Sequence, residues 1–346
     1  MTAAVISEDA RRAVAEFVRA RAADLDLGRT DIRADIGEIG GHGLLATGLG
    51  ESDIREIAGV VEKVAAESLA AGFSLWAQRM ALEYVWRAPD PVRERHLDEL
   101  ASGRRTGVTA MAAALKHLAG LGELPLHADE ADGGRVSGPI AWASNVFPES
   151  LIVFPFRGRD GCGRVGVVSA DADGVRIRPA TELLALGATA STSLAFEHVE
   201  VSGDQLVTGD LSAFCAAIRP IFLLLQTAFC TGVAGAAVRE ASTRLDGLGA
   251  QFRDEYRALA ERHSSARRRL HDYAADAPAT HPRDLLRLRL DAARIAVEAT
   301  RLESTLRGGA GYALNCDTNR RFREAAFLPV QSPSEGQLRW ELSQYD

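Results

Sequence analysis

The sequence predicts a multidomain chain with an N-terminal α-helical domain (residues 1–105), a small antiparallel β domain (106–208) and a C-terminal α-helical bundle (209–346). Apolar residues recur at helical spacing in the first and last parts, whereas short β-branched runs separated by Gly and turn pairs fill the middle. The length of 346 residues also exceeds the roughly 250–300 residues at which a single core stops growing. Together these observations favour three packed units in the order α, β, α.

The N-terminal domain is expected to consist of helices separated by Gly-rich turns. Ala13, Phe17 and Val18, for example, share one face of a predicted helix. The expected helices cover Glu8–Asp24, Asp53–Leu75, Trp76–Trp86 and Val92–Leu100. None of these segments shows the alternating pattern of a strand.

The middle domain is expected to contain at least five short strands. They cover Arg135–Ile140, Leu151–Phe156, Arg164–Ser169, Val175–Pro179 and Ser193–Val201. The Asp132-Gly-Gly and Asp171-Ala-Asp-Gly segments are typical of hairpins or loops between successive strands. This pattern favours antiparallel pairing and argues against the βαβ crossovers of a Rossmann fold.

The C-terminal domain is expected to be a bundle of long helices, at Phe214–Leu245, Gly249–Ala275, Arg283–Leu306 and near Thr318–Ala326. In the helix from Arg283, apolar and charged residues alternate as in a helix with one packed and one solvated face. Pro220–Val238 carries no charge and approaches the length of a membrane span. Its Gln and Thr residues favour a buried bundle helix, with a transmembrane helix as the alternative.

Composition excludes several classes of protein. With 47% apolar and 25% charged residues the chain matches an ordinary globular protein, and its net charge of −7 disfavours nucleic acid and anionic membranes as partners. Four widely spaced Cys residues without a Cys-x-x-Cys pair are expected to be free thiols, and no His/Cys set has metal-ligand spacing. The N-terminus lacks a signal-peptide pattern, so we expect a cytoplasmic protein.

Three segments, taken in order, resemble motifs of the acyl-CoA dehydrogenase superfamily. They are Ile140-Ala-Trp-Ala-Ser-Asn145, the run LGATASTSLAFEHVEV from Leu186 to Val201, and Gly308-Gly-Ala-Gly-Tyr312 followed by Arg323-Glu-Ala325. The family has "W-I-T-N", "LG-x-x-x-S-x-T…F-E-x-V-x-V" and "G-G-x-G-Y…R-D-A" at these places. Agreement in order and spacing extends over most of the chain.

The resemblance implies a FAD-dependent oxidoreductase acting on CH–CH groups, with FMN as an alternative cofactor. It implies cofactor-binding roles for Thr109, Trp142, Ser144, Phe252, Gly308, Gly309 and Gly311. Trp142 would lie beside the isoalloxazine, Ser144 near flavin N5 and Thr109 at the pyrimidine edge. The three glycines would approach the pyrophosphate of a neighbouring subunit's flavin, which requires an oligomer. Because Pro220–Val238 also exceeds what a small bundle buries alone, we expect a homodimer or homotetramer.

The sequence departs from the family where the chemistry is expected. The family's catalytic glutamate follows the "R-D-A" segment, and ungapped alignment puts Ser332 in its place, with Glu335 as a weak substitute three residues on. A second base position used by some relatives falls at Ile221–Leu224, which has no carboxylate.

Several residues that bind the cofactor in the family are also replaced in this sequence. The phosphate-binding "T-E-P-x-x-G-S-D" loop corresponds to Thr109–Lys116 and lacks its serine, Gly249 replaces an arginine, and Thr305 replaces a glutamine. Flavin affinity is therefore expected to be lower than in the family. His263, His271 and the Arg267–Arg269 run are interpreted as a solvated helix face, with contact to a phosphate as the alternative.

Three hypotheses follow. The first is an acyl-CoA-dehydrogenase-like FAD-dependent oxidoreductase without the usual catalytic glutamate, acting on a small molecule for which an acyl-CoA thioester is one candidate. The second is a flavin-dependent monooxygenase of the same fold, which needs no such base. The third is a non-catalytic subunit of a hetero-oligomeric dehydrogenase. The sequence does not specify the substrate.

Overall fold

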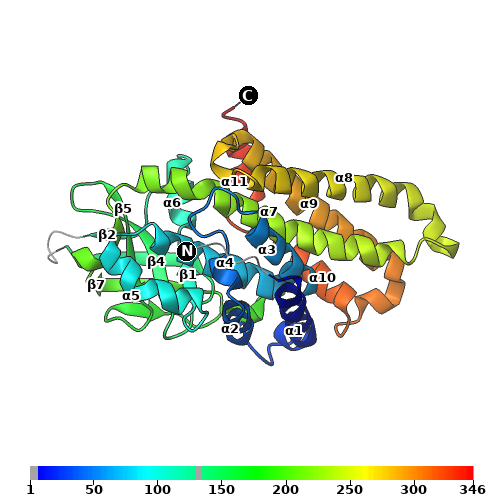
Figure 1. Ribbon diagram of the computed structural model, residues 1–346, viewed down its shortest axis with the longest axis horizontal. Helices are drawn as coiled ribbons and strands as arrows, with labels where there is room; N and C mark the ends of the chain where they lie inside the picture. Colours follow the sequence, from blue (N-terminus) through cyan, green and yellow to red (C-terminus); the bar gives the residue numbers. More distant parts are fainter. Residues whose placement is uncertain (1–6, 129–133, 346) are drawn as a thin grey trace.

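The computed structural model describes residues 7–128 and 134–345, so the expected turn at Asp132-Gly-Gly lies outside the described residues. Figure 1 shows the sheet at one end of the molecule and the long C-terminal helices extending to the other. Helices from the N-terminal part lie between them. The predicted order of α, β and α regions is confirmed.

The N-terminal helices are α1 (Glu8–Asp26), α2 (Arg33–Gly41), α3 (Arg55–Glu67), α4 (Leu69–Trp86) and α5 (Asp90–Ala101). The prediction of one helix over Asp53–Leu75 was wrong. Ser68 has an extended backbone, ends α3, and caps α4 by accepting a hydrogen bond from the backbone N–H of Ala71. The helical period continues across this break, which is why periodicity alone missed it.

The middle region forms one eight-stranded sheet in the order β6-β7-β3-β2-β4-β5-β8, with β1 paired to β4. The strands are β1 (Gly107–Thr109), β2 (His127–Ala128), β3 (Val136–Ala143), β4 (Leu151–Arg157), β5 (Gly163–Ser169), β6 (Val175–Ile177), β7 (Thr192–Val199) and β8 (Leu206–Thr208). The expectation of purely antiparallel pairing was wrong, because β4 runs parallel to both β1 and β2. The long connection through α6 (Ala112–Leu118) and β3 permits these parallel pairs, and only hairpin connections were visible in the sequence.

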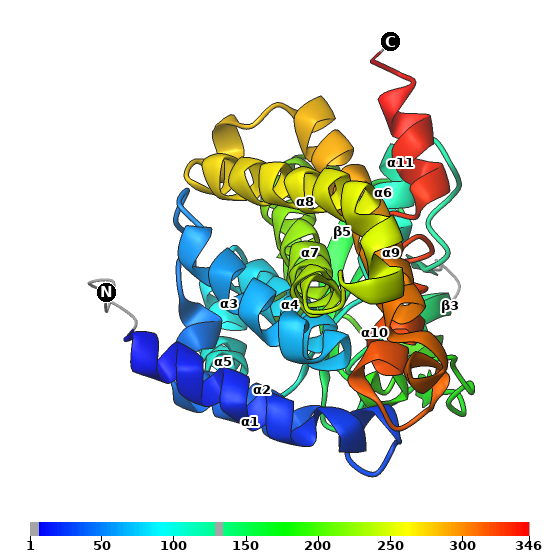
Figure 2. The same cartoon turned by 90° about the vertical axis from the view of Figure 1, so that its right-hand side faces the viewer.

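The C-terminal helices are α7 (Leu211–Ser242), α8 (Arg253–Ala274), α9 (Pro282–Arg307), α10 (Asp317–Ala325) and α11 (Glu335–Leu342). Figure 2 shows α7 in the middle of the helices, and α3, α4, α8 and α9 pack against it. α7 is long and apolar enough to cross a membrane, but its most apolar window is entirely buried within the protein. The interpretation of Pro220–Val238 as a bundle helix is therefore confirmed, and the expectation that it needs a partner chain to cover it was wrong.

Helices from both ends of the chain share one hydrophobic core, and the sheet has a smaller second core. Close approach of α3 and α7 depends on Gly232, where a Cβ would lie 2.3 Å from the carbonyl oxygen of Glu62. The domain boundaries at residues 105 and 208 stay a prediction. All four Cys residues are free thiols, as expected.

Candidate functional site

A chain of hydroxyl groups lies where β3 ends and β7 begins. The Oγ atom of Ser144 is 2.6 Å from Oγ of Ser191, which is 2.7 Å from Oγ1 of Thr189. Thr189 is buried and donates its own hydrogen to the carbonyl oxygen of Leu186 over 2.8 Å. Ser144 thus stands at the outer end of a relay that is anchored inside the protein.

The anchored end fixes the direction of every hydrogen bond in the relay. Thr189 has one hydroxyl hydrogen, which it gives to Leu186, so it can only accept from Ser191. Ser191 has then used its hydrogen and must accept from Ser144. Ser144 therefore offers only acceptor lone pairs to a further partner.

Strained backbone surrounds the same place. Asn145, Leu186 and Ala190 have φ angles of 63°, 67° and 47°, values that side-chain-bearing residues rarely adopt. The buried Asn145 side chain holds its conformation by donating to the carbonyl oxygens of Ser74 (3.0 Å) and Gly107 (3.3 Å). It thereby ties the end of β3 to α4 and β1. Such strain is kept where surrounding contacts over-determine the backbone, often at functional sites.

The two other residues expected at the flavin ring lie on β3 and β1, which are not neighbours in the sheet. Trp142 has 58% of its surface exposed, and Ser144, two residues later, is half-buried in the bend that follows the end of β3 at Ala143. Thr109 ends β1, two residues after the Gly107 that Asn145 contacts, and its hydroxyl lies 3.1 Å from that of Tyr84. Burial raises the pKa of Tyr84, so this phenol stays protonated.

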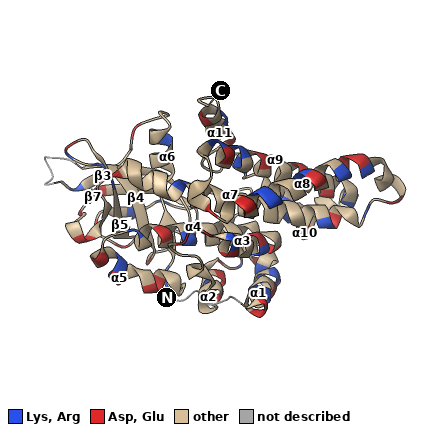
Figure 3. Ribbon diagram, turned by 45° about the horizontal axis from the view of Figure 1, so that its top comes forward, with Lys and Arg blue, Asp and Glu red and all other residues tan. Residues whose placement is uncertain are grey.

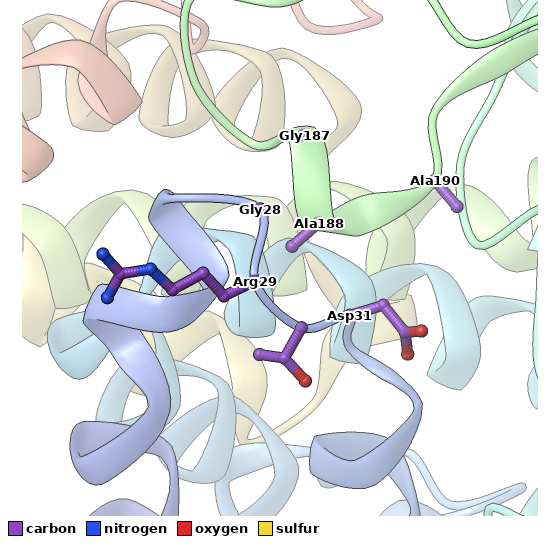
Figure 4. A pocket seen from close by; sticks show the side chains of 7 residues that line it. Gly28, Arg29, Asp31, Gly187, Ala188 and Ala190 are labelled. Atoms are coloured by element: carbon purple, nitrogen blue, oxygen red, sulfur yellow. The ribbon is translucent and has the colours of Figure 1, made fainter.

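A hollow of about 510 Å³ adjoins the relay. It lies between the Gly28–Asp31 loop, which joins α1 to α2, and the Gly187–Ala190 turn that carries Thr189 (Figure 4). The Ala188 side chain points toward the Gly28–Asp31 loop, whereas the guanidinium of Arg29 points away from the Gly187–Ala190 turn (Figure 4). Glycine and alanine leave this wall smooth, which suits the approach of a flat or bulky ligand.

A buried polar network holds the segment in which the family's base is expected. Arg289 of α9 is fully buried and donates to the side-chain oxygens of Gln226 (3.1 Å) and Gln331 (2.7 Å). Both amides in turn donate to the carbonyl oxygen of Ser332, over 2.9 and 2.7 Å. Among the described residues Arg289 has no carboxylate partner, and its Nη1 atom has no hydrogen-bond partner. The solvated charged face expected for this helix is therefore wrong at Arg289.

Glu335, the expected substitute base, is held in ion pairs. Its Oε1 atom lies 2.8 Å from Nη2 of Arg294 and also accepts from Arg339. The hydrogen bond from Arg294 is the main reason why the pKa of Glu335 is lowered. A carboxylate with a lowered pKa is a weaker base, so Glu335 is poorly suited to proton abstraction. The other expected base position, Ile221–Leu224, is buried and apolar.

The Arg323-Glu-Ala325 motif joins the C-terminal helices to the N-terminal ones. Arg323 forms a two-pronged ion pair with Asp26 at the end of α1, at 2.9 and 2.5 Å. The buried Glu324 accepts from the backbone N–H of Leu69, the first residue of α4. Burial raises the pKa of Glu324, although Arg320 lies nearby. These contacts give the motif a structural role.

The expected glycine loop lies at the far end of the bundle. Gly308 ends α9 with a φ of +66°, and a Cβ at Gly308 or Gly309 would meet nothing within 4 Å. Gly311 is buried against Arg307. Three large apolar side chains are exposed at this end: Leu248, Tyr312 and Leu314. Phe252 does not join them, because it packs against the helical core.

The solvated face expected on α8 is wrong at His263 and His271. His271 and Arg267 contact the buried Glu62 of α3, at 2.8 and 3.2 Å, and Nε2 of His263 lies 3.0 Å from the carbonyl oxygen of Thr231 on α7. Arg267 and Arg268 are nevertheless exposed, as expected, and Arg269 is half-buried. The spacing of His263, Arg267 and His271 by four positions could have indicated a packed face.

No family model matches the sequence, and no curated protein matches it. Solved structures do. Butyryl-CoA dehydrogenase from Megasphaera elsdenii superposes with a TM-score of 0.85 at 14% identity, covering 100% of this chain and 99% of that one. This chain has the acyl-CoA dehydrogenase fold.

Other solved structures similar to this chain have names that refer to different activities or ligands. A nitrososynthase from Micromonospora carbonacea var. africana matches with a TM-score of 0.78 at 20% identity, over 97% of this chain and 95% of that one. PigA with FAD and proline matches with 0.81 at 14% identity, over 99% and 98%. The acyl-CoA dehydrogenase fold is thus confirmed, and the activity has to be argued from the site.

The motif indicated Trp142 and Ser144, but not Ser191 and Thr189 of the relay or the buried Arg289 behind Ser332. Ser191 and Thr189 stand in the segment that resembles the family's β-domain exit, which was the available signal. Arg289 follows Leu285 by four positions, and that spacing places both on the buried face of α9. The charged residues Arg287 and Asp291 on either side of Arg289 suggested a solvated face instead.

Proposed function

We propose that this chain is a FAD-dependent oxidoreductase that does not use a carboxylate base at position 332. The observation that carries the proposal is the Ser144 relay, which begins two residues after the exposed indole of Trp142, where β3 ends, and lies beside a 510 Å³ hollow. An indole face and one directed hydrogen-bond acceptor suit a flat heteroaromatic ring.

The residues fit the isoalloxazine part of FAD better than its pyrophosphate. Trp142 offers a stacking surface, Ser144 an acceptor and Thr109 a half-buried hydroxyl. The segment from Thr109 to Lys116 supplies no serine for the phosphates, and only Lys116 adds a charge there. When bound, FAD supplies the electron-transfer chemistry that the side chains lack.

The helix side of the site disfavours a long acyl thioester as substrate. Aromatic rings fill the space between α4 and α7 next to the segment that leads to Ser332; they belong to Phe73, Trp76, Phe222, Phe229 and Phe327. Ring centroids 4.9–5.3 Å apart leave no room for an alkyl chain among them. We therefore expect a compact substrate and no α-proton abstraction by residue 332.

A flavin-dependent monooxygenase is the second candidate, and the relay favours it. Ser144 can accept a hydrogen bond but not donate one. N5 of reduced flavin carries a hydrogen, whereas N5 of oxidised flavin is an acceptor. Ser144 therefore supports binding of reduced flavin delivered from elsewhere, the co-substrate of such an enzyme.

We propose that the chain forms a homodimer or homotetramer through the glycine end of the bundle. The exposed Leu248, Tyr312 and Leu314 there would be covered by a second copy, and the open space at Gly308 and Gly309 would admit its bound cofactor. A hetero-oligomer with an active homologue is the alternative. Light scattering that reports a stable 37.0 kDa monomer at micromolar concentration would contradict this assembly.

Flavin titration tests the proposed function. Purified protein is mixed with FAD and, without oxygen, with reduced FAD, and binding is followed by absorbance and flavin fluorescence. We expect both forms to bind, with reduced FAD bound more tightly. Bleaching of bound FAD by acyl-CoA supports dehydrogenation, and oxygen consumption with reduced FAD supports monooxygenation. Failure to bind either form contradicts the proposal and leaves the non-catalytic subunit.

A further inference from the structure

A second cavity lies between α1, α3, α7 and α8. This α3–α8 groove has a volume of about 670 Å³, within the range of small-molecule sites. Gly59 of α3 and Gly235 of α7 line it; a Cβ at Gly59 would meet nothing within 4 Å, whereas the His263 ring and the Arg239 side chain cover Gly235. Figure 3 shows Lys, Arg, Asp and Glu residues along α8.

At the base of the groove lies the buried carboxylate of Glu62. It accepts from Nε2 of His271 (2.8 Å), Oγ1 of Thr231 (2.8 Å) and Nε of Arg267 (3.2 Å). Burial acts to raise its pKa, but the hydrogen bond from His271 and the charge of Arg267 hold it below the usual value. Glu62 is thus ionised and fully engaged by groups of α7 and α8.

The other carboxylates of the groove are engaged as well. Glu8 accepts from Lys63 at 3.0 Å, Glu56 pairs with Arg11, and Glu67 pairs with Arg19 at 2.7 Å. The groove therefore has no carboxylate left to attract a cation or to neutralise a further guanidinium.

Two guanidinium groups keep unused donors that face the groove. Arg239 has no acceptor for its guanidinium among the residues that the structure describes. Arg267 contacts Glu62 through Nε alone, so within the same described residues both of its terminal nitrogens are without a partner. The Arg239 side chain folds back over Gly235, where a Cβ would lie 3.4 Å from Nη1 of Arg239 and 3.2 Å from the His263 ring.

We propose that the α3–α8 groove binds the phosphate group of an organic phosphate between Arg239 and Arg267, above Gly235. The carboxylates of the groove already accept hydrogen bonds, whereas the two guanidinium groups still have N–H donors to offer. Such a site favours a ligand that is an anion. Arg239 and Arg267 reach the groove from different helices, so they approach a ligand from two directions. A phosphate offers acceptor oxygens outside a single plane and can meet both, whereas one planar carboxylate matches a single guanidinium fork.

The glycines explain how such a ligand gains access. A side chain at Gly235 would displace the Arg239 guanidinium and the His263 ring, and one at Gly59 would project into space that is now open. The site shares no residue with the proposed flavin site, so the inference stands whether or not flavin binds.

Calorimetric titration with pyrophosphate, in a phosphate-free buffer of low ionic strength, tests the proposal. We expect wild-type protein to bind pyrophosphate and Arg239→Ala to bind it about tenfold more weakly. The Arg239 guanidinium makes no hydrogen bond or ion pair within residues 7–128 and 134–345, so this variant should fold as the wild type does, which thermal unfolding checks. Arg267→Lys, which keeps the charge but loses the fork, should weaken binding less than Arg239→Ala. Arg268→Ala, which removes an exposed neighbour bonded only to Ser264, should bind as wild type does.

Three results would overturn the proposal. One is the absence of pyrophosphate binding by wild-type protein. Another is an equal loss in Arg239→Ala and Arg268→Ala, which would indicate general attraction to a basic surface. The third is tighter binding of succinate than of pyrophosphate, which would assign the groove to carboxylates.

Discussion

The sheet side and the helix side of the candidate active site differ in which of the residues expected from the acyl-CoA dehydrogenase fold they contain. The sheet side has an exposed indole, a half-buried threonine and a directed serine, which are the groups expected at a flavin ring. The helix side has Ser332 where a carboxylate is expected, and behind it the buried Arg289, which has no carboxylate partner in the part of the chain that the structure describes. In this chain the proposed cofactor site and the position of the expected base therefore depend on different elements, so one can change without the other.

Restoring a carboxylate on the helix side should produce the largest effect. If only the base is missing, Ser332→Glu should raise the rate of acyl-CoA-dependent flavin bleaching by roughly 10²–10⁴-fold, the usual contribution of a general base. Ser332→Gln has the same size without the charge and serves as control. Rapid bleaching by wild-type protein would show that another group acts as base, and the two sides would then not differ as described.

Removing the buried charge should destabilise the helix side specifically. Arg289→Met keeps the volume but leaves the side-chain oxygens of Gln226 and Gln331 buried without their donor. Each stranded group costs about 1–3 kcal/mol, so we expect the free energy of unfolding to fall by roughly 2–4 kcal/mol, because relief of the buried charge offsets part of the loss.

Urea unfolding measures this change. Arg287→Met, at an exposed position of the same helix, should leave stability nearly unchanged. An Arg289→Met protein as stable as the wild type would show that the network does not hold the Ser332 segment.

The relay on the sheet side predicts a smaller effect with a definite sign. Ser191→Ala frees the hydrogen of Ser144, which can then donate to an acceptor such as N5 of oxidised flavin. The preference for reduced over oxidised FAD should fall by up to about tenfold, which corresponds to a midpoint potential lower by about 30 mV for a two-electron couple. Spectroscopic redox titration measures it.

Ser193→Ala on the same strand is the matched control, because Ser193 is not part of the relay. An unchanged potential in Ser191→Ala, with flavin bound, would show that the relay does not reach the cofactor.

Much of the fold was predictable because periodicity reports burial. The strand at Leu151–Phe156 and the apolar helix around Pro220–Val238 appear where their patterns indicated. The break at Ser68 was not predictable, since a capping serine leaves the apolar period intact on both sides. The parallel pairing of β4 with β1 depends on contacts between residues more than forty positions apart, which local patterns do not encode.

The site was predictable only where single residues matched a motif. Trp142 and Ser144 are two residues apart in the motif, and the structure places Trp142 near the end of β3 and Ser144 in the bend that follows it. The relay through Ser191 and Thr189 depends instead on how a short turn meets the end of β3, with strained residues on both sides. Likewise, Arg289 is buried because α7, α9 and the segment of residues 328–331 meet around it. The sequence of any one of these segments does not predict this burial.

The last and smallest expected effect concerns the indole of Trp142. Its exposed face can stack on an aromatic ring, and such contacts contribute about 0.5–1.5 kcal/mol beyond area burial. Trp142→Ala should therefore weaken FAD binding roughly two- to tenfold in a fluorescence titration. Ile177→Ala, which removes another exposed apolar side chain from the same sheet, should not change binding. Equal affinities in wild type and Trp142→Ala would place the flavin away from β3, and the contrast between the two sides of the site would then lose its cofactor half.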